Sequence, residues 1–258
     1  MNKDTKWPFA GACVIGTQHE KSEGRCEDAR AYRSAPNGIA LAYSVSDGAG
    51  SARYGYKGAK IVSRVVAEWL SRHFDFARSA PLEDLRSTLY RQLHKALSRA
   101  SIKENCQMKD LACTLIGAVA GANGEWVAVH LGDGGIVARV GDVVGVLSMP
   151  MKGEFANQSH FATDADALYH IYVYRSETTK PLSRPNALVL FTDGLENVLV
   201  NRRSGRIAGA TLKMLSWLDS YPPPVVNKAI KSNLLETMRL HSGDDCTLVL
   251  LSGPRQAV

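Results

Sequence analysis

Aspartates recur in this chain where an apolar run begins or ends. "YSVSDGAG" contains Asp47, "AVHLGDGG" contains Asp133, "LVLFTDGLEN" contains Asp193, and "SGDDCTLVLL" contains Asp244 and Asp245. Any one of them could be an ordinary turn, because Asp-Gly is a favoured turn dipeptide. Four such places, in a chain without a catalytic-looking Ser-His pair, favour a shared function. Converging carboxylates raise one another's pKa values and destabilise a fold, and divalent cations remove that cost.

The residue types of this set indicate which cations would bind. Mg²⁺ and Mn²⁺ take carboxylate and carbonyl oxygens, whereas Zn²⁺ prefers His and Cys. A further acidic pair, Glu27-Asp28, lies in "GRCEDAR", so the set contains only carboxylates. Two hard ions about 4 Å apart could share Asp47, lower the pKa of a bridging water and present hydroxide to a bound phosphorus.

The glycines after Asp47 also raise the possibility of a nucleotide loop. A dinucleotide fingerprint would follow Gly48 and Gly50 with a third glycine, where this chain has Arg53. A Walker-type loop would place Lys and then Ser or Thr where the chain has Tyr56 and Lys57. Both nucleotide-binding motifs fail on residue type.

Composition predicts one large domain with a sizeable core, because the chain has 258 residues. The formal charge is +6, but Lys and Arg are spread out without interleaved aromatics, so we expect an anionic substrate and no nucleic-acid partner. Neither a signal peptide nor an 18-residue apolar run occurs, so we expect a cytoplasmic protein with no membrane partner. The five scattered cysteines contain no C-x-x-C pair and are predicted to be buried free thiols.

Periodicity predicts the elements that must position the acids. Apolar spacings of three and four predict helices over 55–74, 82–97, 208–219 and 225–241. Short apolar runs predict strands over 39–46, 111–120, 126–131, 135–140, 143–147, 168–174, 187–192 and 246–251. Tight turns at Asn123-Gly124 and Gly141-Asp142 indicate hairpins, which favour antiparallel sheets covered by helices.

Together the motifs "EDA", "SDGAGS", "LGDGG", "LFTDGLE" and "GDDCTL" resemble, in order and spacing, those of the metal-dependent protein phosphatases of the 2C type, in a bacterial-looking variant. The resemblance spans residues 11 to 251. It implies an α+β fold, a four-layer α-β-β-α sandwich of two antiparallel sheets flanked by helices, as a single domain over 1–258. It also implies two Mn²⁺ or Mg²⁺ ions with a weaker third site, and a flap beside them at 148–167 that helps to select the substrate.

The resemblance implies a role for each acid of the first sheet. Asp47 would bridge the two metals, and Gly48 would give its backbone carbonyl to one of them. The pair Glu27 and Asp28 would serve the metal shared with Gly48, directly or through water.

The remaining acids match other positions of the family pattern. Asp193 and Asp244 would hold the second metal, and Asp133 matches the ligand of the weaker third metal. Asp245 matches a polar position behind the ligands. Asn197 stands where many relatives have a further aspartate, which implies a weaker or absent third site.

Two catalytic positions depart from the family pattern. Many members carry a histidine, proposed as general acid, two residues after the bridging aspartate, where this chain has Ala49. Proton donation would then come from metal-bound water or another side chain, and His19 is our candidate. The phosphate-binding arginine of better-known eukaryotic members corresponds to Glu23, so Arg25, shifted by two residues, is our candidate, with Arg53 and His19 as alternatives.

The sequence therefore predicts a metal-dependent serine/threonine phosphoprotein phosphatase, monomeric, acting on phosphoserine and phosphothreonine proteins opposite a cognate kinase. The alternative is a catalytically weak or inactive phosphatase-fold protein that binds a phosphoprotein or kinase partner. A phosphatase for small phosphoesters and a nucleic-acid-binding domain are further rivals, which substrate comparison and salt-dependent binding would distinguish.

Overall fold

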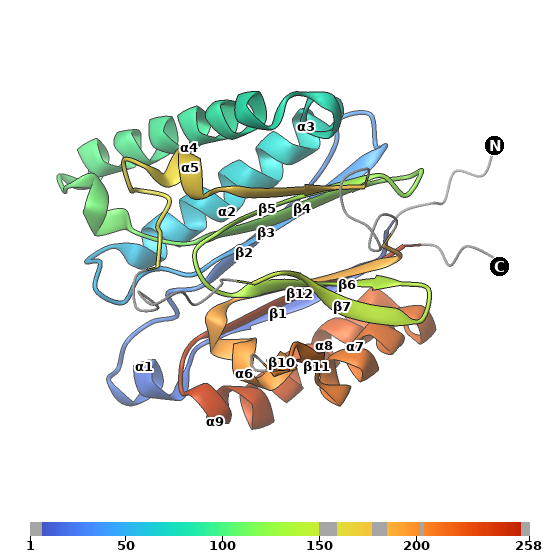
Figure 1. The fold of residues 1–258 in the computed structure, drawn as a ribbon. Helices are drawn as coiled ribbons and strands as arrows, with labels where there is room; N and C mark the ends of the chain where they lie inside the picture. Colours follow the sequence, from blue (N-terminus) through green and yellow to red (C-terminus); the bar gives the residue numbers. More distant parts are fainter. Residues whose placement is uncertain (1–6, 150–158, 177–184, 202–203, 254–258) are drawn as a thin grey trace.

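Two five-stranded antiparallel sheets face each other and carry helices on both outer faces (Figure 1). The computed structural model describes residues 7–149, 159–176, 185–201 and 204–253. The order of layers is helix, sheet, sheet, helix, which confirms the predicted α+β sandwich.

The first sheet has the order β2-β3-β4-β5-β8. Its strands are β2 (Ala29–Ser34), β3 (Ala40–Ser46), β4 (Leu115–Gly121), β5 (Trp126–Leu131) and β8 (Tyr172–Arg175). The outer face is covered by α2 (Gly55–Arg72), α3 (Phe74–Ser79) and α4 (Leu82–Glu104). Leucines at every fourth position of α4, namely Leu85, Leu89, Leu93 and Leu97, are buried, so the helix presents one apolar stripe to the layers beneath.

The second sheet has the order β1-β12-β9-β6-β7. Its strands are β1 (Phe9–Val14), β12 (Cys246–Ser252), β9 (Ala187–Phe191), β6 (Gly135–Val140) and β7 (Val143–Ser148). Its outer face is covered by α7 (Gly209–Ser220) and α8 (Pro223–Asn233), whose buried residues share one core with β1, β9 and β12.

Shorter elements connect the layers. They are α1 (Thr17–Lys21), α5 (Ala167–His170), α6 (Glu196–Leu199), α9 (Arg239–Ser242), the ribbon of β10 (Val200–Asn201) and β11 (Arg206–Ile207), the 3₁₀ turns Met108–Leu111 and Asp193–Leu195, and the π-helical turn Leu234–Met238. No helix in the described ranges is long and apolar enough to cross a bilayer.

A third core lies between the two sheets. Tyr43 and Trp126 of the first sheet meet Leu190 and Val249 of the second, and all four are at most 1% exposed. Every residue of β4, β9 and β12 is buried, because these central strands have one face on a helix layer and the other on the opposite sheet. Such strands read as continuous apolar runs rather than as alternating patterns.

Most of the predicted elements are confirmed within one or two residues, and both hairpin turns join antiparallel neighbours. The strand predicted over 168–174 is wrong in its first half, where α5 forms a helical turn that buries Ala167 and leaves Tyr169 exposed. The strand predicted to begin at 111 begins at Leu115, because the 3₁₀ turn precedes it. The helix predicted over 225–241 begins at Pro223 and contains the π turn.

All five cysteines are free thiols, as predicted. Only Cys113 and Cys246 are buried, so the prediction of burial is wrong for Cys13, Cys26 and Cys106, which are partly exposed.

Candidate metal centre

Strand register brings the acids of the first sheet to one end of the molecule. Ala29 at the start of β2 pairs with Ser46 at the end of β3. The next residues outward are Asp28 and Asp47, which therefore leave the sheet side by side. Hydrogen bonds between the backbone and side chain of Thr114 and the backbone of Asp47, at 2.8 and 3.0 Å, fix the position of the β3 end.

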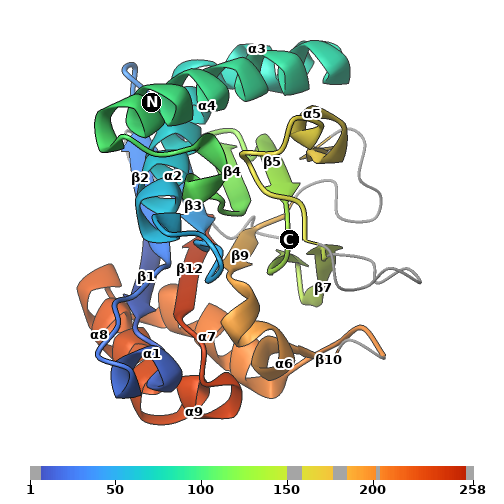
Figure 2. The same ribbon diagram turned by 90° about the vertical axis from the view of Figure 1, so that its left-hand side faces the viewer.

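The second sheet presents its acids at the same end. Phe191 of β9 pairs with both Leu248 of β12 and Gly135 of β6, so the end of β9 lies beside the starts of its two neighbours. Asp193 follows β9 and Asp133 precedes β6. These strand ends lie on the left of Figure 1 and face the viewer in Figure 2.

Three carboxylates from this edge converge. Asp47, Asp133 and Asp193 each offer an oxygen, and these oxygens lie within 4.8 Å of one another. Within the described ranges no Lys, Arg or His forms an ion pair with any of the three. Among the residues that the structure describes, the cluster is therefore a concentration of negative charge that no ion pair neutralises.

The pKa values of these acids reflect that arrangement. Burial, followed by the charges of Asp28, Asp193 and Asp133, raises the pKa of Asp47 well above its ordinary value. Burial, followed by the charges of Asp133 and Asp244, raises the pKa of Asp193 to about 6. Bound divalent cations would reverse these shifts, because an adjacent positive charge favours the ionised form.

The acidic pair before β2, Glu27 and Asp28, has carboxylate oxygens that could bind a cation. Asp28 is 4% exposed, and its Oδ2 accepts a hydrogen bond from the Thr192 hydroxyl at 2.8 Å. Its Oδ1 and the Oε2 of Glu27 are buried and have no hydrogen-bond partner among the described residues. A buried polar atom without a partner is costly, and coordination of a cation would remove that cost. The donor set at this edge consists of carboxylate oxygens, which suits Mg²⁺ or Mn²⁺.

Gly48 allows the loop after β3 to lie against the start of α2. A Cβ atom at this position would meet the backbone of Gly55 at 2.4 Å, so another residue could not keep this path. The Gly48 amide donates to the carbonyl of Glu27 at 3.2 Å, which ties the loop to the acidic pair.

Asp244 and Asp245 lie beside the start of β12 and differ in role. Asp244 is exposed, contributes to the raised pKa of Asp193, and is not one of the three converging acids. Asp245 is 2% exposed and accepts backbone hydrogen bonds from Gly16 and Glu27, each at 2.6 Å. Asp245 therefore joins three chain segments at this edge.

His19 in α1 is held by the same carboxylate. Its Nδ1 lies 3.0 Å from Oδ2 of Asp245, and its side chain is 31% exposed. Burial opposes a charge on the imidazole, but the hydrogen bond with Asp245 and the charges of Glu27 and Asp244 outweigh it and raise the pKa of His19. A partly exposed, oriented and readily protonated imidazole thus lies beside the acidic edge.

Comparison with known proteins identifies the family. A sequence profile described as Protein phosphatase 2C matches residues 15–235. The chain belongs to the protein phosphatase 2C family. Serine/threonine-protein phosphatase 3 of Escherichia coli (strain K12) is 28% identical over 198 residues, which cover 76% of each chain.

Solved structures share the fold of this 2C-family chain. The S. agalactiae serine/threonine phosphatase superposes with a TM-score of 0.66 at 14% identity, over 96% of this chain and 100% of that one. The catalytic domain of the phosphatase PstP, solved with two manganese ions, gives a TM-score of 0.56 at 17% identity, over 95% and 97% of the two chains.

The two arginines considered for phosphate binding point to different places. The Arg25 guanidinium lies 4.4 Å from the centre of the Tyr56 ring, and its charge acts on Glu27. Arg53 stacks at 5.0 Å on Tyr54 and lines a separate hollow near Cys106. Arg25 is therefore the one that lies beside the acidic edge.

Two of the positions predicted to depart from the 2C-family pattern, Ala49 and Asn197, carry neither an acid nor a base. Ala49 is 9% exposed and packs with Ala52, Ala112 and Phe161 in a small apolar cluster. Asn197 is exposed and lines a shallow hollow beside the β10–β11 ribbon.

Sequence reasoning missed three hydroxyl residues that hold the acids. The Ser159 hydroxyl donates to Oδ2 of Asp133 at 2.8 Å, Thr192 holds Asp28, and Thr114 holds the backbone of Asp47. Thr192 could have been noticed, since it immediately precedes Asp193. Ser159 belongs to the predicted flap, of which residues 150–158 lie outside the described ranges.

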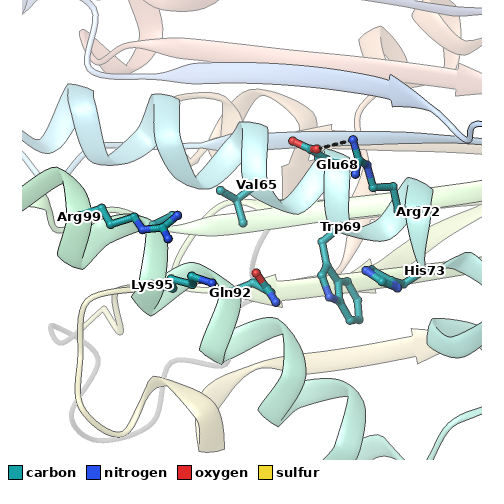
Figure 3. A pocket seen from close by; sticks show the side chains of 9 residues that line it. Val65, Glu68, Trp69, Arg72, His73, Gln92, Lys95 and Arg99 are labelled. Atoms are coloured by element: carbon teal, nitrogen blue, oxygen red, sulfur yellow. Dashed lines mark ion pairs between the residues drawn. The ribbon is translucent and has the colours of Figure 1, made fainter.

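A groove between α2 and α4 is a different feature (Figure 3). Its lining includes Arg72, Lys95 and Arg99 together with Glu68, which pairs with Arg72 at 2.9 Å. None of the strand-end acids lines it. The groove is on the outer helical layer, so the converging carboxylates are the better candidate for the reaction centre.

Proposed function

We propose that this chain is a serine/threonine phosphoprotein phosphatase that depends on Mn²⁺ or Mg²⁺. The observation that carries the proposal is the convergence of ligand oxygens from Asp47, Asp133 and Asp193 within 4.8 Å of one another, with no ion pair to any of the three in the described part of the chain. Membership of the protein phosphatase 2C family and the similarity to serine/threonine-protein phosphatase 3 of Escherichia coli support the reaction class.

The acidic residues at the strand ends fit two hard cations such as Mn²⁺ or Mg²⁺. We propose that Asp47 would serve both, and that the Gly48 carbonyl and the pair Glu27 and Asp28 would serve one of them. Asp193 and Asp244 would serve the other, and Asp133 would serve a third, weaker ion. When bound, such ions supply Lewis acidity and a water activated for attack on phosphorus.

The remaining steps belong to side chains of the chain itself. Hydrolysis of a phosphoserine or phosphothreonine ester consumes one water and leaves the serine or threonine hydroxyl and inorganic phosphate. We assign His19 to donate the proton that the departing oxygen needs, because Asp245 orients it and raises its pKa. Arg25 is assigned to bind the phosphate oxygens, since its planar fork of donors suits them.

We further propose a cytoplasmic monomer whose partners are phosphoproteins made by a cognate kinase. The net charge of +6 supports attraction of an anionic substrate.

Phosphate release from phosphothreonine and phosphoserine peptides tests the proposal. We expect release with Mn²⁺ or Mg²⁺, none with EDTA, and a loss of at least about a hundredfold in Asp193→Asn, because a metal ligand is removed. Asp142→Asn, in the exposed β6–β7 turn, is the matched control and should retain activity. Calorimetric titration of Mn²⁺ into the same proteins reads out the site independently of turnover.

The outcome that contradicts the proposal is specific. Folded protein that binds Mn²⁺ but releases no phosphate from any peptide would favour the alternative, a phosphatase-fold protein that binds a phosphoprotein or kinase. Ala49, which supplies no proton donor, would then be the first residue to replace with histidine.

A further inference from the structure

A second group of metal-ligating side chains lies away from the strand-end acids. His160, Asp166 and His170 each offer one ligand atom, and these atoms lie within 4.8 Å of one another. His170 is the last residue of α5, and Asp166 immediately precedes that helix. The group therefore comes from a single short segment, folded back on itself.

The three side chains are already oriented toward one another. Nε2 of His170 lies 3.2 Å from Oδ2 of Asp166, and the two imidazole rings stack with their centres 3.5 Å apart and their planes at 12°. Nδ1 of His160 also lies 4.0 Å from Oδ2 of Asp164. The histidine side chains are 39% and 35% exposed, so an ion can reach them from solvent.

The backbone that carries them is fixed on two sides. Towards α4, the Tyr90 hydroxyl donates to the Ala165 carbonyl at 3.0 Å and Arg86 donates to the Ile171 carbonyl at 2.8 Å. Towards the sheets, the Ala162 amide donates to the Cys113 carbonyl at 2.8 Å. The backbone of a site on such a scaffold needs little ordering when a ligand binds.

We propose that His160, Asp166 and His170 form a second metal site, selective for Zn²⁺ over Mg²⁺. Two imidazoles and one carboxylate are a ligand set typical of Zn²⁺, with water in the fourth position, whereas Mg²⁺ prefers oxygen ligands alone. Binding requires the nearly parallel rings to open toward the ion by side-chain rotation. Oδ2 of Asp164 lies 4.0 Å from Nδ1 of His160, which is longer than a hydrogen bond, so Asp164 adds negative charge beside the site.

The two residues that flank His160 connect the proposed zinc site to the candidate metal centre. Ser159, the neighbour of His160, donates to Asp133, and Phe161 packs on Ala49 in the loop after Asp47. A bound Zn²⁺ would fix the position of residues 159–170 against α4. It would therefore hold Ser159 and Phe161 in contact with the centre.

Zinc binding to the full chain, with Asp193→Asn as the parent and excess Mg²⁺ present, tests the proposal. This background weakens the candidate centre, so the result does not depend on the proposed phosphatase activity. In competition with a chromophoric chelator we expect one Zn²⁺ per chain, and at least about tenfold weaker binding in His160→Ala and in His170→Ala. His73→Ala removes an exposed histidine outside the cluster and should bind as the parent does.

Co²⁺ supplies a second readout through its visible absorption. The parent should show the intense bands of four-coordinate Co²⁺, and His170→Ala should lose them, while the two proteins keep the same melting temperature without metal. Unchanged zinc affinity in both histidine variants, or no zinc bound by the parent, would overturn the site and leave a stacked histidine pair held by Asp166.

Discussion

At the scale of single residues, one carboxylate determines what His19 can do. Asp245 accepts hydrogen bonds from two backbone amides and contacts Nδ1 of the imidazole, which leaves Nε2 as the nitrogen able to meet a substrate. The same carboxylate raises the pKa of His19, so more of the imidazole is protonated near neutral pH than for a free histidine. Both effects are those required of a proton donor, and Ala49 cannot supply them.

Replacement of His19 by alanine should therefore affect substrates according to their leaving group. We expect a loss in kcat of about a hundredfold on a phosphoserine peptide, whose alkoxide needs a proton, and of less than about tenfold on p-nitrophenyl phosphate. Exposed His241 in α9 provides the control substitution, His241→Ala, which should leave both rates unchanged. Equal losses on the two substrates would instead assign His19 a structural role.

At the scale of elements, the acids are placed by close contact between a loop and a helix. The loop after β3 can follow its path only because Gly48 has no side chain, since a Cβ would meet Gly55 at 2.4 Å. Gly50, two residues on, has open space around its own Cβ position. One loop thus offers two glycines, only one of which the packing requires.

Alanine substitution of each glycine distinguishes the effect of a steric clash, expected at Gly48, from the effect of losing a flexible glycine, expected at Gly50. Gly48→Ala should lose about 1–3 kcal/mol of unfolding free energy and bind Mn²⁺ at least about tenfold more weakly, because the loop and Asp47 must shift. Gly50→Ala should change stability by less than about 0.5 kcal/mol and leave Mn²⁺ affinity intact. Urea unfolding and calorimetric titration measure the two quantities. Wild-type Mn²⁺ affinity in Gly48→Ala would show that Asp47 is positioned independently of this contact.

The elements that sequence reasoning found and missed differ in their position in the sheets. Central strands such as β5 (Trp126–Leu131) are wholly buried, and their apolar runs gave the correct bounds. The strands β1 and β2 were not predicted, and both lie at sheet edges. In β2, only Ala29 is buried and the other five of its six residues are partly or fully exposed, so "ARAYRS" carries no strand pattern.

For the candidate site, too, the sequence predicted some features and not others. Apolar runs that end in Asp47, Asp133 and Asp193 predicted the acids, because antiparallel strand ends meet at one edge. The contacts between these acids and residues distant in sequence could not be predicted. Ser159 reaches Asp133 from 26 residues away, and Thr192 reaches Asp28 from 164 residues away, which only the assembled layers determine.

At the scale of the whole molecule, the two sheets bring together charges that oppose folding unless a cation binds. Burial and neighbouring acids raise the pKa of Asp193 from 3.8 to about 6. In the metal-free protein Asp193 therefore holds a proton more often in the folded than in the unfolded chain between these pH values, so its contribution to stability falls as pH rises through that window.

Comparison of wild type with Asp193→Asn isolates the contribution of Asp193 to the pH dependence of stability. Between pH 4.5 and 7.5 in EDTA, wild type should lose about 2 kcal/mol of unfolding free energy relative to the variant, because ionisation of Asp193 costs more in the folded state. With saturating Mn²⁺ at pH 7.5, wild type should instead have the higher unfolding free energy of the two proteins, since the cation stabilises the chain that keeps its ligand. Urea unfolding at both pH values, with Asp142→Asn as control, measures the difference. A gap between wild type and Asp193→Asn that is independent of both pH and Mn²⁺ would mean that Asp193 neither carries the raised pKa nor binds the metal.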